Sequence, residues 1–235
     1  MKQILITGAS SGVGEAAARY LVAQGYGVVL VGRNSTKLQA LCNEFGDVAT
    51  MFEYDLSDYN RIEEIFSFCK KQEIKLDGLV YSAGIALNQP MRSLDMAQVS
   101  QVMDINCMSF VAMCRHMTSR KHSNDGTSIV AISSLSAETY YPGTVSYSMS
   151  KSAVNAAVKV MAKELVRRRI RVNAILPANI NTPMGPAPDD PVMLAQQPMG
   201  IIEKEYVAYL IEFLLSERSK YITGTLFPMS AGMAY

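Results

Sequence analysis

The chain has 235 residues, of which 49% are apolar and 18% are charged, and its formal net charge is +1. This length and apolar content are enough to bury one large core or two small ones. A charge so close to zero gives no electrostatic reason to expect nucleic acid or an acidic membrane surface as a partner. Because there are two histidines and no CxxC spacing among the four cysteines, no metal site is expected.

The N-terminal residues indicate a protein of the cytoplasm. Met1 and Lys2 lead directly into QILIT, which we expect to be a strand of the folded domain and not part of a signal peptide. No run approaches the roughly 18 apolar residues that a membrane span needs. We therefore expect a soluble, cytoplasmic protein without a membrane partner.

Short apolar runs alternate with longer helical patterns along the chain. The predicted strands are residues 3–7, 27–32, 48–54, 78–82, 128–132, 170–176 and 225–228. The predicted helices are residues 13–24, 35–44, 58–72, 95–119, 147–168 and 203–217. Runs such as VVLV and SIVAIS are typical of parallel strands that helices cover on both faces. The alternation predicts an α/β, Rossmann-like, doubly wound fold with a mostly parallel, seven-stranded sheet, formed by one domain over residues 1–235.

The first predicted strand leads into a glycine-rich turn in LITGASSGVGEAAARYL at 5–21. Gly8 allows a sharp turn, Gly12 lets a phosphate approach the backbone, and Gly14 lets the helix pack on the sheet. Similar glycines also occur in plain turns, but the position before an amphipathic helix favours a dinucleotide site. The residues expected at this site are Gly8, Ser10, Ser11, Gly12, Val13 and Gly14.

The second predicted strand ends in VVLVGRN. Folds that bind NAD often carry an acidic residue there, which bonds the ribose 2′-hydroxyl. Here Gly32 leaves room, and Arg33 can meet a 2′-phosphate with two hydrogen bonds. An exposed arginine that caps a turn is the alternative. We expect NADPH or NADP as the cofactor, while NADH or NAD stays open.

Six of the nine prolines lie between residues 177 and 200. Irregular segments of this length in compact domains are often functional lids or are disordered. Because this segment follows a predicted strand, it leaves the sheet at the carboxyl edge, where such folds bind ligands. We expect a short substrate lid around residues 183–202.

Tyr147 and Lys151 lie four residues apart in VSYSMSK, within a predicted helix. Residues at this spacing share one helix face, about 5–6 Å apart at Cβ. An ammonium group there lowers the pKa of a phenol. Because the chain has 12 tyrosines, one such pair can also arise by chance, and the pair alone is a weak indication of catalysis.

Motifs along the whole chain resemble those of the short-chain dehydrogenase/reductase family in its single-domain form. The similar segments are TGASSGVG at 7–14, YDL at 54–56, YSAG at 81–84, MDINCMSF around Asn106, AISSLSA around Ser134, VNAILPANINTPM at 172–184 and YITGTLFPMSAG at 221–232. The resemblance implies four catalytic residues, which are Asn106, Ser134, Tyr147 and Lys151. It also implies further contacts with the cofactor by Arg33, Asp55, Leu56, Ser82, Ala83, Gly84, Tyr147, Lys151, Pro177, Ile180 and Thr182.

Hydride transfer between nicotinamide and a carbonyl or secondary alcohol is the reaction that this resemblance implies. Tyr147 would be the general acid/base, and a partly exposed Lys151 together with the oxidised nicotinamide would lower its pKa. Ser134, with Ser133 as its competitor, would orient the substrate oxygen. Asn106 would hold a water that relays protons from Lys151.

Two other functions stay open, which are an NAD-dependent alcohol dehydrogenase and a non-catalytic dinucleotide sensor. By the same resemblance, helices 95–119 and 147–168 would form the contacts of a homodimer or homotetramer.

Three departures from the family pattern stand out. Ser82 replaces an asparagine and Ala178 a glycine along the cofactor groove, and Ser230-Ala231 replaces an Asp-Gly pair near the expected C-terminal subunit contact.

An apolar set of residues is the candidate wall of the substrate pocket, with closure of the core as the alternative role. The set is Leu87, Met91, Tyr140, Tyr141, Met184, Met193 and Leu194. Its composition favours a small or medium ketone, aldehyde or acyl-type substrate over a polyanion.

Overall fold

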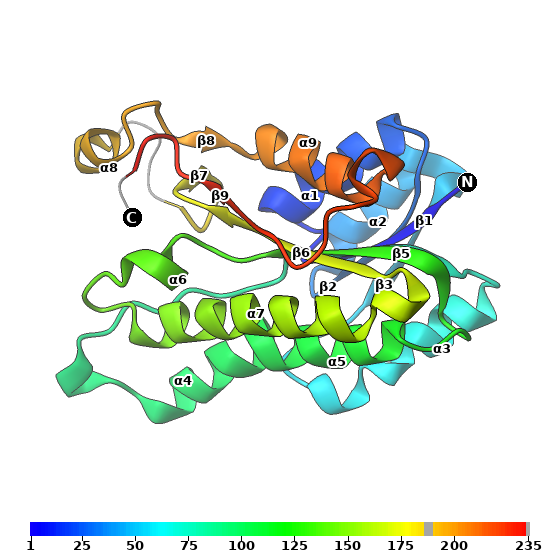
Figure 1. Cartoon of the computed structure of the whole chain (residues 1–235), viewed down its shortest axis with the longest axis horizontal. Coiled ribbons are helices and arrows are strands. Elements are labelled where there is room, and N and C mark those ends of the chain that lie inside the picture. The colour runs from blue at the N-terminus through cyan, green and yellow to red at the C-terminus, as the bar shows by residue number, and fades with distance from the viewer. Residues whose placement is uncertain (186–189, 234–235) are drawn as a thin grey trace.

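Seven parallel strands form the central sheet of the protein. This computed structural model describes residues 1–185 and 190–233. The strands are β1 Gln3–Thr7, β2 Gly27–Gly32, β3 Ala49–Glu53, β4 Leu76–Tyr81, β5 Ser123–Ile132, β6 Arg171–Pro177 and β9 Leu226–Met229. Their spatial order is β3-β2-β1-β4-β5-β6-β9 (Figure 1). The order reverses between β1 and β4, and this reversal is where doubly wound folds open a crevice for ligands.

Helices cover both faces of the sheet (Figure 1). The α-helices are α1 Gly12–Ala23, α2 Ser35–Phe45, α3 Glu63–Lys71, α4 Met96–Met103, α5 Ser109–Met117, α6 Ser136–Thr139, α7 Val145–Glu164, α8 Pro191–Gln196 and α9 Lys204–Leu215. One core joins the sheet to α1, α2 and α9, and a second core on the other face joins it to α3, α5 and α7. The predicted doubly wound fold is therefore confirmed.

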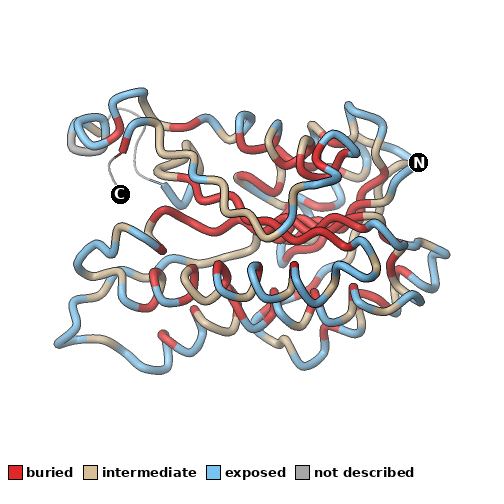
Figure 2. Tube along the Cα trace, in the orientation of Figure 1, coloured by how far each residue is buried: buried red, intermediate tan, exposed pale blue. Residues whose placement is uncertain are grey.

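The middle of the sheet is buried because both faces are covered. β2 and β6 consist only of buried residues, whereas the edge strands β3 and β9 are half-buried or exposed. Figure 2 shows this buried trace concentrated along the central strands. Continuous apolar runs made these strands visible in the sequence, since alternation is lost when no face meets water.

A π-helical turn at Asp104–Met108 interrupts the single helix predicted over residues 95–119. The buried hydroxyl of Tyr81, at the end of β4, donates to the carbonyl oxygen of Ile105 and contacts Ser109 Oγ. Ser109 also donates to the Ile105 carbonyl, at 2.7 Å. The contacts of Tyr81 come from a strand distant in sequence, so helical periodicity could not indicate them.

Other boundaries differ from those expected. The predicted helix at 58–72 begins as a 3₁₀ turn, Tyr59–Arg61, and β5 begins at Ser123 instead of residue 128. Two short strands, β7 Ile180–Asn181 and β8 Ile202–Glu203, pair in parallel beside the main sheet. Each has two residues, which is too short for a periodic signal. Further 3₁₀ turns are Gly46–Val48, Met91–Ser93, Val166–Arg168 and Glu217–Ser219.

Among the described residues, no helix is long and apolar enough to span a bilayer. Within the same residues, no group of three or more His, Cys, Asp or Glu side chains could hold a metal ion.

Candidate active site

Three adjoining cavities follow the carboxyl edge of the sheet. The first, of 520 Å³, extends from Gly8 to Asp55, and we call it the adenosine-side cavity. The second, of 410 Å³, includes Tyr147 and Lys151 and is called the central cavity. The third, of 590 Å³, also touches Tyr147 and is called the substrate-side cavity. Each neighbouring pair shares lining residues, so together they form one long cleft.

The glycine-rich turn after β1 is shaped by close backbone contacts. Gly8 has a φ of +65°, and a Cβ there would lie 3.0 Å from backbone atoms of Ala83. A Cβ on Gly14 would lie 2.4 Å from the carbonyl oxygen of Gly8. Any side chain at these two positions would push the turn, α1 and the loop after β4 apart. Glycine therefore keeps this end of the cleft open for a ligand at the N-terminus of α1.

Thr7 connects the turn after β1 to the loop after β4, a role that our sequence reasoning missed. Its hydroxyl oxygen accepts hydrogen bonds from the backbone N–H groups of Ser82 and Ala83, at 3.1 and 3.2 Å. The side chain of Thr7 is fully buried. Because it bonds backbone atoms, the Ser82 departure leaves this connection intact.

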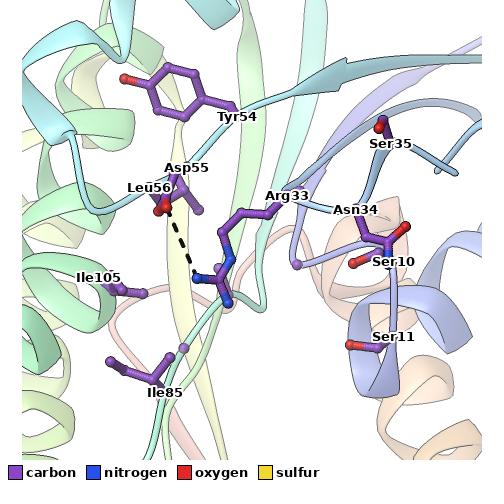
Figure 3. A pocket seen from close by; sticks show the side chains of 14 residues that line it. Ser10, Ser11, Arg33, Asn34, Ser35, Tyr54, Asp55, Leu56, Ile85 and Ile105 are labelled. Atoms are coloured by element: carbon purple, nitrogen blue, oxygen red, sulfur yellow. Dashed lines mark ion pairs between the residues drawn. The ribbon is translucent and has the colours of Figure 1, made fainter. Parts of the chain in front are cut away.

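Arg33 and Asp55 face each other across the adenosine-side cavity (Figure 3). The guanidinium nitrogen lies 4.0 Å from the carboxylate oxygen, and both side chains are more than half exposed. Tyr54 and Leu56 line the same cavity. Asn34, which was not expected here, also lines it and caps α2 by accepting from the Lys37 N–H at 3.0 Å.

Asn106 lies in the π-helical turn, and its fully buried side chain holds the loop after β4. Its Oδ1 accepts from the Ile85 N–H at 2.8 Å, and its Nδ2 donates to the Ile85 carbonyl at 2.9 Å. Nδ2 also donates to Ser150 Oγ, at 3.0 Å. The amide is thus engaged by protein groups, and the water relay expected at Asn106 stays a prediction.

Tyr147 and Lys151 lie on one face of α7, and both line the central cavity. The Lys151 Nζ atom lies 5.6 Å from the centre of the Tyr147 ring and donates to the Ile132 carbonyl at 2.8 Å. Ser134 lines both the central and the substrate-side cavities. Ser133 instead donates to the Lys151 carbonyl, at 3.3 Å, and is absent from the lining of the substrate-side cavity. The geometry favours Ser134 over Ser133 as the serine near a substrate.

Burial dominates the electrostatics of this pair. It raises the pKa of the Tyr147 hydroxyl, and a hydrogen bond with Ser134 lowers that pKa in part. Burial also lowers the pKa of the Lys151 ammonium to about 8, while the nearby Cys107 raises it. The expectation of a partly exposed Lys151 is wrong, since the residue is only 4% exposed. The protein groups alone therefore do not make Tyr147 a stronger acid, and a lowered pKa would require the charge of the cofactor.

The remaining residues expected to bind the cofactor lie along the same cleft. The adenosine-side cavity is lined by Gly8, Ser10, Ser11, Arg33, Asp55, Leu56, Ala83 and Gly84, and the central cavity by Gly12, Val13, Ser82, Pro177, Ile180 and Thr182. Gly14 contributes through its packing against Gly8 and not through the lining. Ile85 and Ile105 are lining residues that we did not expect, and Ala178 lines the central cavity, along the groove where its departure from the family pattern was placed.

Only part of the expected substrate wall lies at the substrate-side cavity. Tyr141 and Met184 line it, whereas Tyr140, at a φ of +51°, lines a separate groove with Val145 and Met149. Met91 is 73% exposed on the surface. Leu87 and Leu194 do not line the cavity, and the side chain of Met193 lies outside the described residues.

Met233 is a buried wall residue that our sequence reasoning missed. The Tyr141 hydroxyl donates to its sulfur at 3.6 Å. The tail before Met233 is fixed by a hydrogen bond from the Met199 N–H to the Ala231 carbonyl, at 3.0 Å. Ala231 has a φ of +47°, so the Ser230-Ala231 departure keeps a backbone conformation that favours glycine.

The two ends of the expected lid are joined by Gln197, which is fully buried. Its Oε1 accepts from the Asn179 N–H, and its Nε2 donates to the carbonyls of Asn179 and Gly200, all within 3.0 Å. Ile180 and Ile202 pair next to these bonds, in β7 and β8. The base of the segment is therefore held by protein bonds, and its motion as a lid stays a prediction.

A family model described as Enoyl-(Acyl carrier protein) reductase matches residues 8–234. The chain belongs to the short-chain dehydrogenase/reductase family and is thereby placed among NAD(P)-dependent oxidoreductases.

Individual relatives agree with this placement over their full lengths. The 3-oxoacyl-(acyl-carrier-protein) reductase FabG of Rickettsia bellii is 32% identical, over 97% of this chain and 95% of that protein. A blue fluorescent protein from a metagenomic library, solved with NADPH, has a TM-score of 0.92 at 28% identity, over 100% of this chain and 98% of its own. The 3-ketoacyl-(acyl-carrier-protein) reductase of Brucella melitensis, solved with NADH, has a TM-score of 0.91 at 26% identity, over 100% and 98%.

Proposed function

We propose that the protein is an NADPH-dependent oxidoreductase that acts on a carbonyl or secondary alcohol, with Tyr147 as general acid and base. The observation that carries the proposal is the position of Tyr147 and Ser134, which line both the central and the substrate-side cavities. A cofactor in the central cavity and a substrate in the substrate-side cavity would therefore meet at these two hydroxyl groups.

The nicotinamide, when bound, supplies a hydride in the reduction and accepts one in the reverse reaction. In the reduction, the carbonyl carbon gains the hydride and the carbonyl oxygen gains the proton of the Tyr147 hydroxyl. C=O thus becomes CH–OH, and Tyr147 afterwards recovers a proton from solvent. Positioned proton transfer of this kind contributes typically about 10²–10⁴-fold to a rate.

Ser134 would orient the substrate oxygen. Its Oγ accepts from the Ser136 N–H at 3.1 Å, which fixes its position and leaves its own proton to donate. Lys151 is held from behind by the Ile132 carbonyl, at 2.8 Å, and its remaining N–H groups can face the cofactor ribose. Its buried positive charge would stabilise the phenolate form of Tyr147 after proton transfer.

Arg33 supports NADPH over NADH, because its guanidinium lines the adenosine-side cavity where a 2′-phosphate would lie. The second candidate is an NAD-dependent alcohol dehydrogenase. It is favoured by Asp55, whose carboxylate lies 4.0 Å from Arg33 and could accept from ribose hydroxyls. A non-catalytic sensor would bind either dinucleotide without turnover.

Tyr147→Phe provides the direct test. Absorbance of NADPH is followed with a panel of ketones and aldehydes, and NADPH binding is measured by fluorescence titration. Turnover should fall at least about 100-fold while the Kd for NADPH changes by less than about threefold. Tyr221→Phe, at a residue that is 89% exposed, is the matched control. Near-native turnover of Tyr147→Phe would refute the proposed role.

A homodimer or homotetramer stays part of the proposal. It is supported by apolar side chains that α4, α7 and the region between them leave exposed, including Met96, Met108, Val111, Met149 and Val160. Light scattering at micromolar concentration should give a mass of at least twice 25.8 kDa.

A further inference from the structure

We infer that the substrate is electrically neutral, an inference that rests on the proposed function. The described residues that line the substrate-side cavity lie in segments 86–88, 134–147 and 177–185, together with Gln196 and Met233. The sequence of these segments contains no lysine, arginine or histidine. Among the described residues, no aspartate or glutamate lines this cavity either. A carboxylate, phosphate or acidic carrier protein at this end of the cleft would therefore find no cation to pair with among the described lining residues.

The cations of the cleft lie instead on its cofactor half. Arg33 lines the adenosine-side and central cavities, and Lys151 lines the central cavity, but neither lines the substrate-side cavity. Lys151 is also buried and engaged by the Ile132 carbonyl. The cleft is thus divided by charge, with cations where an anionic dinucleotide would lie and an uncharged lining, among the described residues, where the substrate would lie.

The other lining residues suit an uncharged molecule with an apolar part. Thr139 and Thr144 donate to the carbonyls of Leu135 and Tyr141, at 3.1 and 2.6 Å, so their protons are already used. Met184 and Met233 add polarisable apolar surface on the same wall. The volume of 590 Å³ is typical of sites for small organic ligands. We therefore assign the site to neutral ketones and aldehydes, or the corresponding secondary alcohols.

Paired substrates that carry the same reacting carbonyl group but differ in charge test this inference. One pair is ethyl 3-oxobutanoate and 3-oxobutanoate. A second pair carries the same 3-oxobutanoyl group on N-acetylcysteamine, which is neutral, or on coenzyme A, which is a polyanion. A third pair is ethyl benzoylformate and benzoylformate. With NADPH at saturation, kcat/KM should be at least about tenfold higher for the neutral member of each pair that reacts, because the anionic member loses its hydration without gaining a cation partner.

Equal or better use of the anionic members would overturn the inference while leaving the proposed reductase intact. The same holds for efficient turnover of a 3-oxobutanoyl acyl carrier protein. Failure of every compound on a wide carbonyl panel, in a protein that binds NADPH, would overturn the proposed function and the inference with it.

A charge added to the wall gives an independent test. Asn88 is exposed and lines the substrate-side cavity, so Asn88→Lys should shift kcat/KM toward the anionic member by about fivefold relative to its neutral partner. Asn43→Lys, at an exposed residue of α2, adds the same charge away from the cavity and should leave the ratio unchanged. An unchanged ratio in Asn88→Lys would contradict the inference, provided that thermal unfolding shows the variant to be folded.

Discussion

The Lys151 ammonium donates to the carbonyl oxygen of Ile132, at 2.8 Å, in a site where the residue is only 4% exposed. This bond joins α7 to the end of β5 directly behind Tyr147. A single backbone acceptor does not replace the hydration of an ammonium group. The pKa of Lys151 is lowered to about 8 for that reason.

Replacement of Lys151 by methionine should stabilise the protein near neutral pH while abolishing turnover. Between pH 8 and the ordinary value of 10.5, the unfolded chain binds more protons than the folded one, so wild-type stability rises with pH through this window. Below pH 8 both states are protonated, and the cost of the buried charge is present in full. We expect Lys151→Met to raise the free energy of unfolding at pH 7 by about 1–2 kcal/mol, after loss of the Ile132 bond.

Urea denaturation at pH 7, 9 and 10 measures this effect. The gain of Lys151→Met over wild type should shrink toward zero at pH 10. Lys159→Met, at an exposed lysine of the same helix, should show no such trend. A gain that does not depend on pH would mean that the pKa of Lys151 is not lowered.

Arg33→Ala should weaken NADPH binding by about 10–100-fold, because charge-assisted hydrogen bonds contribute about 1.5–3 kcal/mol. NADH binding should change by less than about threefold, since NADH has no 2′-phosphate for Arg33 to meet. Fluorescence titration with each dinucleotide measures both effects. Arg61→Ala is a matched control, because both side chains are 65% exposed. An equal loss for NADPH and NADH would argue against recognition of the 2′-phosphate.

Gln197→Leu should loosen the segment between Asn179 and Gly200. The change leaves the Asn179 N–H and two carbonyls without their side-chain partner, and we expect a loss of about 2–4 kcal/mol in stability. Hydrogen exchange should be faster at the Asn179 amide and in residues 195–202. Gln196→Leu, at the exposed neighbouring residue, should change stability by less than about 0.5 kcal/mol. Unchanged exchange at Asn179 would show that Gln197 does not hold the base of this segment.

Ala231→Gly should stabilise the protein by up to about 1 kcal/mol, because Ala231 has a φ of +47° and glycine adopts this region without steric cost. The greater entropy of glycine in the unfolded chain offsets part of the gain. Ala156→Gly, at an exposed position in α7, should instead destabilise by about 1 kcal/mol. Thermal unfolding compares the two directly, and destabilisation by both substitutions would contradict the strain at Ala231.

Strand positions could be predicted from the sequence because the parallel strands are buried on both faces. VVLVG at 28–32 is an uninterrupted run, and its burial leaves few alternatives to a central strand. The glycine-rich turn was visible for a related reason, since Gly8 and Gly14 allow contacts that no other residue tolerates.

Features that depend on contacts between distant segments could not be predicted in this way. The π-helical turn is bonded by Tyr81 from β4, and Thr7 bonds a loop that follows it by 75 residues. Met233 reaches the substrate-side cavity only because β9 lies beside β6. The burial of Lys151 likewise follows from packing. Its sequence spacing from Tyr147 predicts that the two residues share a helix face, but it does not predict how exposed Lys151 is to solvent.

The double hydrogen bond between Asn106 and Ile85 has a practical consequence for mutagenesis. Ile85 lines both the adenosine-side and the central cavities, so releasing it would alter the seat of the dinucleotide at two places at once. An Asn106 variant with low turnover would therefore mix weaker cofactor retention with slower chemistry. If rates were measured only at subsaturating NADPH, a loss of turnover caused by weaker cofactor binding would be mistaken for slower proton transfer.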